Sequence, residues 1–231
     1  MGQWKFRTAG TAKALEYAAE FLKEAGWIYD ANAKYLLLPV PTTQDHRENL
    51  RCDTVLIGGN LDTSLYGDRK CVDLLQDPFY LAENASITAY CAVRYAEEKL
   101  PVILAGCPVL IIGWGRIGKC LGQLLRNMGA CVTVFARKPE DRASLTSLGY
   151  SVTSIFDDIQ HFRVIFNTAP TPMLSEYLLR PDQIKIDLAS VKGIAGDDVV
   201  WARGLPGKDA PESSGRLIAA TIDRLRKEGS L

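Results

Sequence analysis

The feature that most restricts the fold of this chain is an apolar run, Cys107–Ile112, that leads directly into Gly113-Trp114-Gly115-Arg116-Ile117-Gly118. An unbroken apolar run is typical of a strand that is buried on both faces of a parallel sheet. The residues that follow have helical spacing as far as Met128, so the glycines lie in a turn between a strand and a helix. A Gly-x-Gly-x-x-Gly pattern in this setting predicts a dinucleotide-binding turn.

The three glycines have separate roles in such a turn. Gly113 permits the tight turn, Gly115 lets a pyrophosphate approach the backbone, and Gly118 lets the helix pack closely on the strand. The first turn of the helix then offers free N–H groups and the positive end of the helix dipole to the phosphates.

Strand and helix patterns alternate along the whole chain, which favours an α/β fold. The part after the glycine turn is typical of a Rossmann domain with a doubly wound parallel sheet, and the part before it predicts a second, smaller α/β domain. After the turn we predict strands at Cys131–Phe135, near Val152, at Arg163–Phe166 and at Ile184–Leu188, and a helix at Pro139–Leu148. Before it we predict strands at Lys5–Arg7, Tyr35–Pro41 and Thr54–Ile57 and helices at Thr11–Ala25 and Asn84–Lys99.

The chain ends in an amphipathic helix, Glu212–Lys227. Its apolar face needs cover, so we expect this helix to return to the N-terminal domain. The predicted domains are therefore a Rossmann domain at 94–211 and a discontinuous domain at 1–93 plus 212–231, with a cleft between them.

Composition excludes several classes of protein. Lys plus Arg (27) equals Asp plus Glu (27), which argues against a nucleic-acid binder with a broad basic surface and against a polybasic membrane anchor. The longest uncharged stretch, Leu100–Gly115, is shorter than the roughly 20 residues of a membrane span, and the N-terminus lacks a secretory signal. The six cysteines lack metal-site spacing, so we predict no metal site and mostly packed, reduced thiols in a cytoplasmic protein.

The end of the second Rossmann strand indicates which dinucleotide binds. A site for NAD usually has Asp or Glu there, to hold the ribose 2′-hydroxyl. Here the predicted strand ends at Phe135 and is followed by Ala136, Arg137 and Lys138, with Glu140 and Asp141 as a partial offset. Two cations attract a 2′-phosphate, so we predict NADP as the cofactor, with NAD less favoured.

Five motifs, spread over most of the chain, resemble those of one known family, the A subunit of dipicolinate synthase. The two most specific are the strand end Ile186–Ser190 and the stretch Gly204–Pro211, because generic nucleotide-binding folds do not require them. The others are Leu37–Thr43, the glycine turn with Ala136-Arg137, and Phe166–Pro170.

The resemblance implies an NADP-linked oxidation of a cyclic dihydro- or tetrahydropyridine dicarboxylate to dipicolinate, a reaction of spore formation, with a flavoprotein-like second subunit. It also implies a catalytic domain built from both chain ends.

We further expect a homo-oligomer. Thr88 is kept where the family has Pro-Thr-x-Glu-Gly, but Tyr90 replaces the glutamate, as in a diverged relative.

Two other functions stay open. One is a non-catalytic NADP-binding subunit or scaffold for a flavoprotein, which the loss of the glutamate at Tyr90 favours. The other is a 2-hydroxyacid dehydrogenase-like enzyme, which we disfavour because Leu188-Ala189-Ser190 stands where such enzymes have Arg, and no His follows His161.

The site residues follow from the motifs and the resemblance. We expect the substrate between the two domains, facing the nicotinamide, with hydroxyls, amides and cations bound to its carboxylates. We assign no catalytic residue, because no side chain stands out as a general base. His46 follows the threonine loop and could reach a cleft, although an exposed loop position is favoured, and His161 is expected at the surface. The predicted cofactor-binding residues are Gly113, Trp114, Gly115, Arg116, Ile117, Gly118, Arg137, Lys138, Asn167, Thr168, Ala169, Pro170, Asp187 and Leu188. The predicted substrate-binding residues are Thr42, Thr43, Ser190, Lys192, Gly207 and Lys208.

Overall fold

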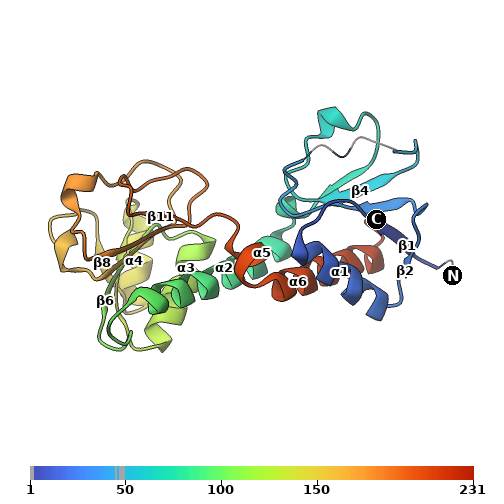
Figure 1. The fold of residues 1–231 in the computed structure, drawn as a ribbon. Coiled ribbons are helices and arrows are strands. Elements are labelled where there is room, and N and C mark those ends of the chain that lie inside the picture. The colour runs from blue at the N-terminus through green and yellow to red at the C-terminus, as the bar shows by residue number, and fades with distance from the viewer. Residues whose placement is uncertain (1–2, 45, 47–49) are drawn as a thin grey trace. The chain divides into compact units, whose positions relative to one another are not determined.

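The structure, a computed structural model, describes residues 3–44, 46 and 50–231 and divides into two compact units (Figure 1). Unit 1 is the part of the chain up to Ile87 together with Pro206–Leu231, and unit 2 is Thr88–Leu205. Each unit contains one parallel sheet with helices packed on it. The predicted fold class, a Rossmann domain with a second α/β domain, is therefore confirmed.

Unit 1 has a five-stranded sheet in the order β2-β1-β3-β4-β5, with every pair parallel. Helix α1 (Lys13–Glu24) packs against the last helix, α6 (Pro211–Lys227), and both contribute to one core with the sheet. Phe6, Leu22 and Ile222 are fully buried there. The strands are β1 (Lys5–Thr8), β2 (Ile28–Tyr29), β3 (Tyr35–Leu37), β4 (Val55–Gly58) and β5 (Cys71–Asp73).

Unit 2 has a six-stranded parallel sheet in the order β11-β10-β9-β6-β7-β8, the doubly wound arrangement of a Rossmann domain. The glycine turn leaves β6, the strand at which the order reverses. The strands are β6 (Pro108–Ile112), β7 (Cys131–Phe135), β8 (Ser151–Thr153), β9 (Val164–Asn167), β10 (Ile184–Asp187) and β11 (Val200–Trp201). The α-helices after β6 and β7 are α3 (Arg116–Asn127) and α4 (Pro139–Ser147).

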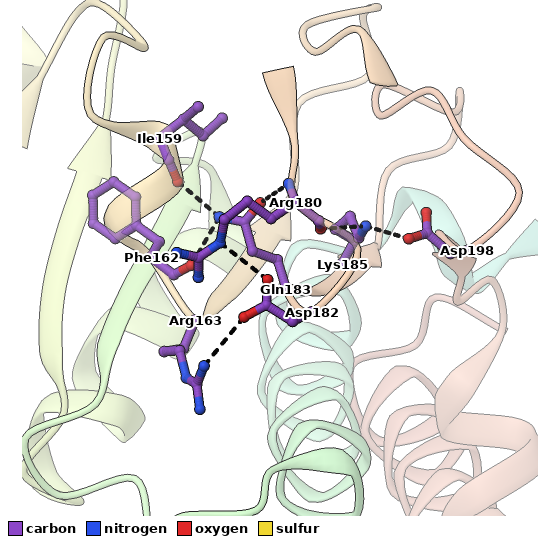
Figure 2. Close-up of polar contacts among 8 residues, drawn as sticks. All are labelled: Ile159, Phe162, Arg163, Arg180, Asp182, Gln183, Lys185 and Asp198. Atoms are coloured by element: carbon purple, nitrogen blue, oxygen red, sulfur yellow. Dashed lines mark hydrogen bonds and ion pairs between the residues drawn. The ribbon is translucent and has the colours of Figure 1, made fainter. Parts of the chain in front are cut away.

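The connections after β8, β9 and β10 are loops, the first two with a short 3₁₀ turn, and residues 151–204 contain no α-helix. Two buried side chains hold these loops to the sheet (Figure 2). The Gln183 amide donates to the carbonyls of Ile159 and Phe162, both at 2.8 Å. The Lys185 ammonium donates to the Arg180 carbonyl at 3.0 Å and pairs with Asp198. These polar contacts act together with buried apolar side chains of the loops, among them Leu174, Ile194 and Val199, which pack on the sheet.

Three predictions about elements need correction. The helix predicted at Asn84–Lys99 is α2 (Pro78–Lys99) and begins earlier, because the Asp77 carboxylate accepts the Tyr80 N–H at 2.8 Å and caps it. The stretch Gly204–Pro211, expected as a loop, contains the short helix α5 (Leu205–Asp209). The strands β2, β5 and β11 were not predicted.

The boundaries between the two units lie within α2, at 87/88, and at the start of α5, at 205/206, whereas the sequence suggested 93/94 and 211/212.

All six cysteines are free thiols. Cys52 and Cys131 are exposed, so the expectation of packed cysteines does not apply to these two.

Candidate cofactor-binding site

The three glycines of the turn differ in what the protein itself requires. Gly113 has a φ of +96°, and a Cβ there would lie 2.8 Å from the Thr168 hydroxyl. A Cβ on Gly118 would lie 2.3 Å from the Gly113 carbonyl oxygen. Gly115 has an ordinary φ of −79°, and apart from its own chain neighbours no atom of the described residues lies within 4 Å of an added Cβ. Internal packing therefore explains two of the glycines, while the third leaves open space above the backbone.

Helix α3 begins at that open space. Gly115 is its N-cap residue and has no side chain to bond the N–H groups of the first turn. Those N–H groups and the helix dipole favour an anion. Arg116, exposed at the first helical position, adds a positive charge, and Ile117 is partly buried in the same turn.

A pocket lies next to the turn, at the carboxyl ends of β6 and β7. Its apolar wall includes Ile112, Phe135 and Met173, and its polar wall includes the exposed side chains of Arg137 and Lys138. The lining residues are Ile112, Gly113, Trp114, Phe135, Ala136, Arg137, Lys138, Asp141, Ala169 and Met173.

The turn that carries the two cations is held by Arg142. Its guanidinium donates to the carbonyls of Ala136 and Arg137, at 2.9 and 2.6 Å. Asp141 places a carboxylate on the same pocket wall. From the sequence, Asp141 was considered only as a partial charge offset and not as a residue of the site. Its position in the first turn of the helix that follows Arg137 and Lys138 could have indicated that it lines the pocket.

Trp114 lines the pocket but also packs on the protein. Its indole would contact a Cβ on Gly122 at 2.9 Å, and its ring lies 5.2 Å from that of Tyr150. We conclude that Trp114 forms a fixed wall of the pocket.

The predicted cofactor contacts Asn167 and Asp187 are fully buried and bonded within the protein. One oxygen of Asp187 accepts from the Asn167 amide and the Ala189 N–H, both at 3.0 Å. The other accepts from the N–H groups of Gly193 at 2.6 Å and Ile194 at 2.9 Å. These two side chains position the loops after β9 and β10, and their contact with a cofactor stays a prediction.

The same loops are tied to the glycine turn. The Thr168 hydroxyl donates to the Ile112 carbonyl at 2.9 Å, and the Ala169 N–H donates to the Asn167 side chain at 3.1 Å. The Leu188 N–H, in turn, donates to the Asn167 carbonyl at 2.8 Å. Ala169 and Pro170 lie beyond β9, where Pro170 is exposed. The carboxyl ends of β6, β9 and β10 thus form one fixed edge of unit 2.

The predicted substrate-binding residues separate between the two units. Ser190 and Lys192 are exposed on the loop that Asp187 holds in unit 2. Thr42, Thr43, Gly207 and Lys208 belong to unit 1. The Thr42 hydroxyl donates to the Pro39 carbonyl at 2.7 Å, which is a structural role, whereas Thr43 is exposed. Gly207 and Lys208 lie in α5.

The two histidines have different surroundings. His161 is exposed, as expected. His46 is partly buried, and among the described residues no group forms a hydrogen bond with its Nε2 atom. Its chain neighbours at 45 and 47–49 lie outside the described residues.

Within the described ranges, no cluster of three or more His, Cys, Asp or Glu side chains could hold a metal ion. None of the described helices is both long enough and apolar enough to span a membrane.

No protein-family model matches the chain. The chain is 25% identical over 206 residues to the A subunit of dipicolinate synthase from Bacillus subtilis (strain 168), covering 80% of this chain and 69% of that protein. The crystal structure of the dipicolinate synthase A subunit from Bacillus halodurans is similar with a TM-score of 0.80 and 20% identity, over 97% of this chain and 98% of that one. A transhydrogenase from Sinorhizobium meliloti is similar with a TM-score of 0.73 and 13% identity, over 94% and 92%.

These comparisons confirm the resemblance predicted from the motifs. The structural comparisons show that the fold is a Rossmann-type α/β fold shared with the dipicolinate synthase A subunit and the transhydrogenase. In sequence and in fold, the chain is similar to the A subunit of dipicolinate synthase, at the low identity of a diverged relative.

Proposed function

We propose that this chain is an NADP-dependent oxidoreductase that oxidises a cyclic dihydro- or tetrahydropyridine dicarboxylate to dipicolinate. The observation that carries the proposal is the open space above Gly115, at the uncapped start of α3 and beside the pocket with Arg137 and Lys138. Within the described residues, no packing contact requires glycine there, whereas a pyrophosphate that approaches the backbone does.

The residues of unit 2 fit a dinucleotide along its length. The first turn of α3 would hold the pyrophosphate through backbone N–H groups. Ile112, Phe135 and Met173 offer an apolar wall to an adenine ring. Arg137 and Lys138 would bind a 2′-phosphate, and the single carboxylate of Asp141 opposes it less strongly than the two cations attract it.

The chemistry that the chain must support is the loss of one hydride and one proton from a dihydropyridine dicarboxylate. A tetrahydropyridine dicarboxylate must lose two hydrides and two protons, and so consumes two equivalents of NADP. A bound nicotinamide supplies the hydride acceptor. Ser190 and Lys192, on the loop beyond β10, would bind a carboxylate through a hydroxyl and an ammonium. Substrate binding by Thr43, Gly207 and Lys208 stays a prediction. We assign no residue as the proton acceptor.

The name of the similar protein describes one part of a larger assembly, so we also propose a second, flavoprotein-like subunit. We propose in addition that the chain forms a homo-oligomer and is cytoplasmic.

A non-catalytic NADP-binding subunit is the second candidate function. It is favoured by Tyr90, whose side chain is 62% exposed on α2 and offers no carboxylate where the family has one. Turnover of dihydrodipicolinate by the purified chain, followed as NADPH absorbance with and without a flavoprotein partner, separates the two.

Cofactor choice is tested by calorimetric titration of NADP and NAD into the wild type and Arg137→Asp. We expect the wild type to prefer NADP. The substitution should weaken NADP binding by about 1–3 kcal/mol, roughly five- to 150-fold in Kd, because it removes a charge-assisted contact and adds repulsion. NAD affinity should stay the same or rise.

Lys13→Asp, the same charge change at an exposed position of α1 in unit 1, serves as the control and should leave both affinities unchanged. Equal affinities of the wild type for NADP and NAD would refute the proposed preference.

A further inference from the structure

An exposed tryptophan stands at the carboxyl edge of the unit 2 sheet. Trp201 lies on the edge strand β11, in register with Asp187 of β10, and its side chain is 46% exposed. Its indole N–H donates to the Ala189 carbonyl at 3.0 Å. This bond fixes the ring beside the loop that carries Ser190, whereas its large apolar area still faces solvent. A tryptophan held in this way is typical of a binding surface.

A cation accompanies the ring. The Arg203 guanidinium lies 5.4 Å from the Trp201 ring centroid, and the Arg203 backbone N–H donates to the Trp201 carbonyl at 3.1 Å. Arg203 is exposed, and in the described part of the chain no residue forms an ion pair or hydrogen bond with its guanidinium. Its planar set of donors is therefore available to a ligand.

The loop next to the ring is rigidly placed. The Ala189 N–H, on the residue that receives the indole bond, itself donates to Asp187 at 3.0 Å. The Lys185–Asp198 pair anchors the residues just before β11, as Figure 2 shows. Trp201 and Ser190 are thus supported by the two buried charged side chains of β10, so their relative positions are set by the sheet.

We infer that Trp201 and Arg203 recognise the substrate of unit 2: the indole stacks on a planar, conjugated ring, and the guanidinium binds a carboxylate on that ring. The inference rests on the proposed function, and it names residues that the sequence reasoning did not include. A guanidinium matches a carboxylate with two parallel hydrogen bonds, and an aromatic face favours a flat ring over a saturated one. The site is therefore selective for an unsaturated cyclic carboxylate.

The test uses the whole chain saturated with NADP, with pyridine-2,6-dicarboxylate as the probe. Its Kd is measured by calorimetry for the wild type, Arg203→Gln, Arg203→Lys and Trp201→Phe. Piperidine-2,6-dicarboxylate, a saturated ring with the same two carboxylates, is titrated in parallel. The Kd of NADP is measured for every variant, and Lys13→Gln, which removes one positive charge at an exposed position of unit 1, serves as the charge control.

We expect Arg203→Gln to weaken probe binding by about tenfold or more, because it removes a charge-assisted pair, and Arg203→Lys to restore part of it. Trp201→Phe should lower the preference for the pyridine over the piperidine ring. The Kd of NADP should not change in any of these variants, which separates recognition from a general loss of structure.

Two results overturn the inference. If the wild type binds the probe and all three variants bind it equally well, Trp201 and Arg203 are not the recognition element, while the proposed function stands. If the wild type binds NADP but neither dicarboxylate, both the inference and the proposed substrate class are wrong.

Discussion

At the scale of single residues, the glycine turn provides a direct test of ligand approach. In Gly115→Ala the new methyl group has no packing contact with the described residues, and the backbone conformation suits alanine. The free energy of unfolding should therefore change by less than about 1 kcal/mol. The same methyl group stands where a pyrophosphate approaches, so NADP affinity should fall by about tenfold or more. Chemical denaturation and calorimetric titration measure the two effects.

Gly118→Ala is the matched comparison, because its Cβ would lie 2.3 Å from the Gly113 carbonyl oxygen. It should lose at least about 1–3 kcal/mol of stability, as overpacked sites do. A Gly115→Ala variant that binds NADP as tightly as the wild type would contradict the proposed cofactor position.

At the scale of elements, α2 and α6 are joined within unit 1 by Asp77 and Arg224. Burial by itself would raise the pKa of Asp77, but the Tyr80 N–H and the Arg224 guanidinium outweigh it and hold that pKa below its usual range. A carboxyl with a lowered folded-state pKa stabilises the protein above its unfolded pKa of about 4, and this contribution is lost as the pH falls through the folded value.

Asp77→Asn keeps the helix cap and removes the charge, so it should cost about 1–2 kcal/mol at neutral pH. The difference from the wild type should shrink below about pH 4. Urea unfolding across pH measures it. Asp53→Asn, in the exposed pair with Arg51, should change stability by less than about 1 kcal/mol at any pH. A difference at Asp77 that persists unchanged into acid would refute the ion-pair explanation.

The individual helices and strands show which parts of the fold could be predicted from the sequence. The strand Cys131–Phe135 was predicted with its full bounds, because an apolar run in a strand–helix alternation leaves little choice. The strands β2 and β11 have two residues each, too few for any periodicity. The N-terminus of α2 had a readable signal, an Asp before a Pro, that the prediction missed.

The site was predictable in part for the same physical reasons. The residues of the glycine turn could be predicted from local sequence, because the turn, its glycines and the start of the helix lie within one short stretch of chain. The role of Asp187 does not, because its four bonds involve loop N–H groups two to seven residues on and the side chain of Asn167 on another strand. Trp201 and Arg203 lie on or next to an edge strand that the sequence pattern does not indicate.

At the scale of the whole molecule, the two units differ in how the chain forms them, and this difference can be tested. Unit 2 is one continuous segment, whereas unit 1 needs both ends of the chain. The last helix reaches α1 through Gly215, where an added Cβ would lie 2.4 Å from the Tyr17 Cβ and 2.7 Å from the Ala14 carbonyl oxygen. A larger side chain at 215 must therefore push α6 away from α1.

Gly215→Val should lower the stability of unit 1 by at least about 1–3 kcal/mol, because the packed backbones cannot make room for the new side chain. Tryptophan signals from Trp4 and Trp27, whose rings lie 5.3 Å apart in unit 1, should be lost at lower urea concentration than in the wild type. NADP binding, which we assign to unit 2, should persist at urea concentrations that unfold unit 1. Ala220→Val, at an exposed position of the same helix, is the control and should behave as the wild type. If NADP binding and the Trp4–Trp27 signal disappear together in Gly215→Val, the two units unfold as one, and the cofactor site depends on the contact between α1 and α6.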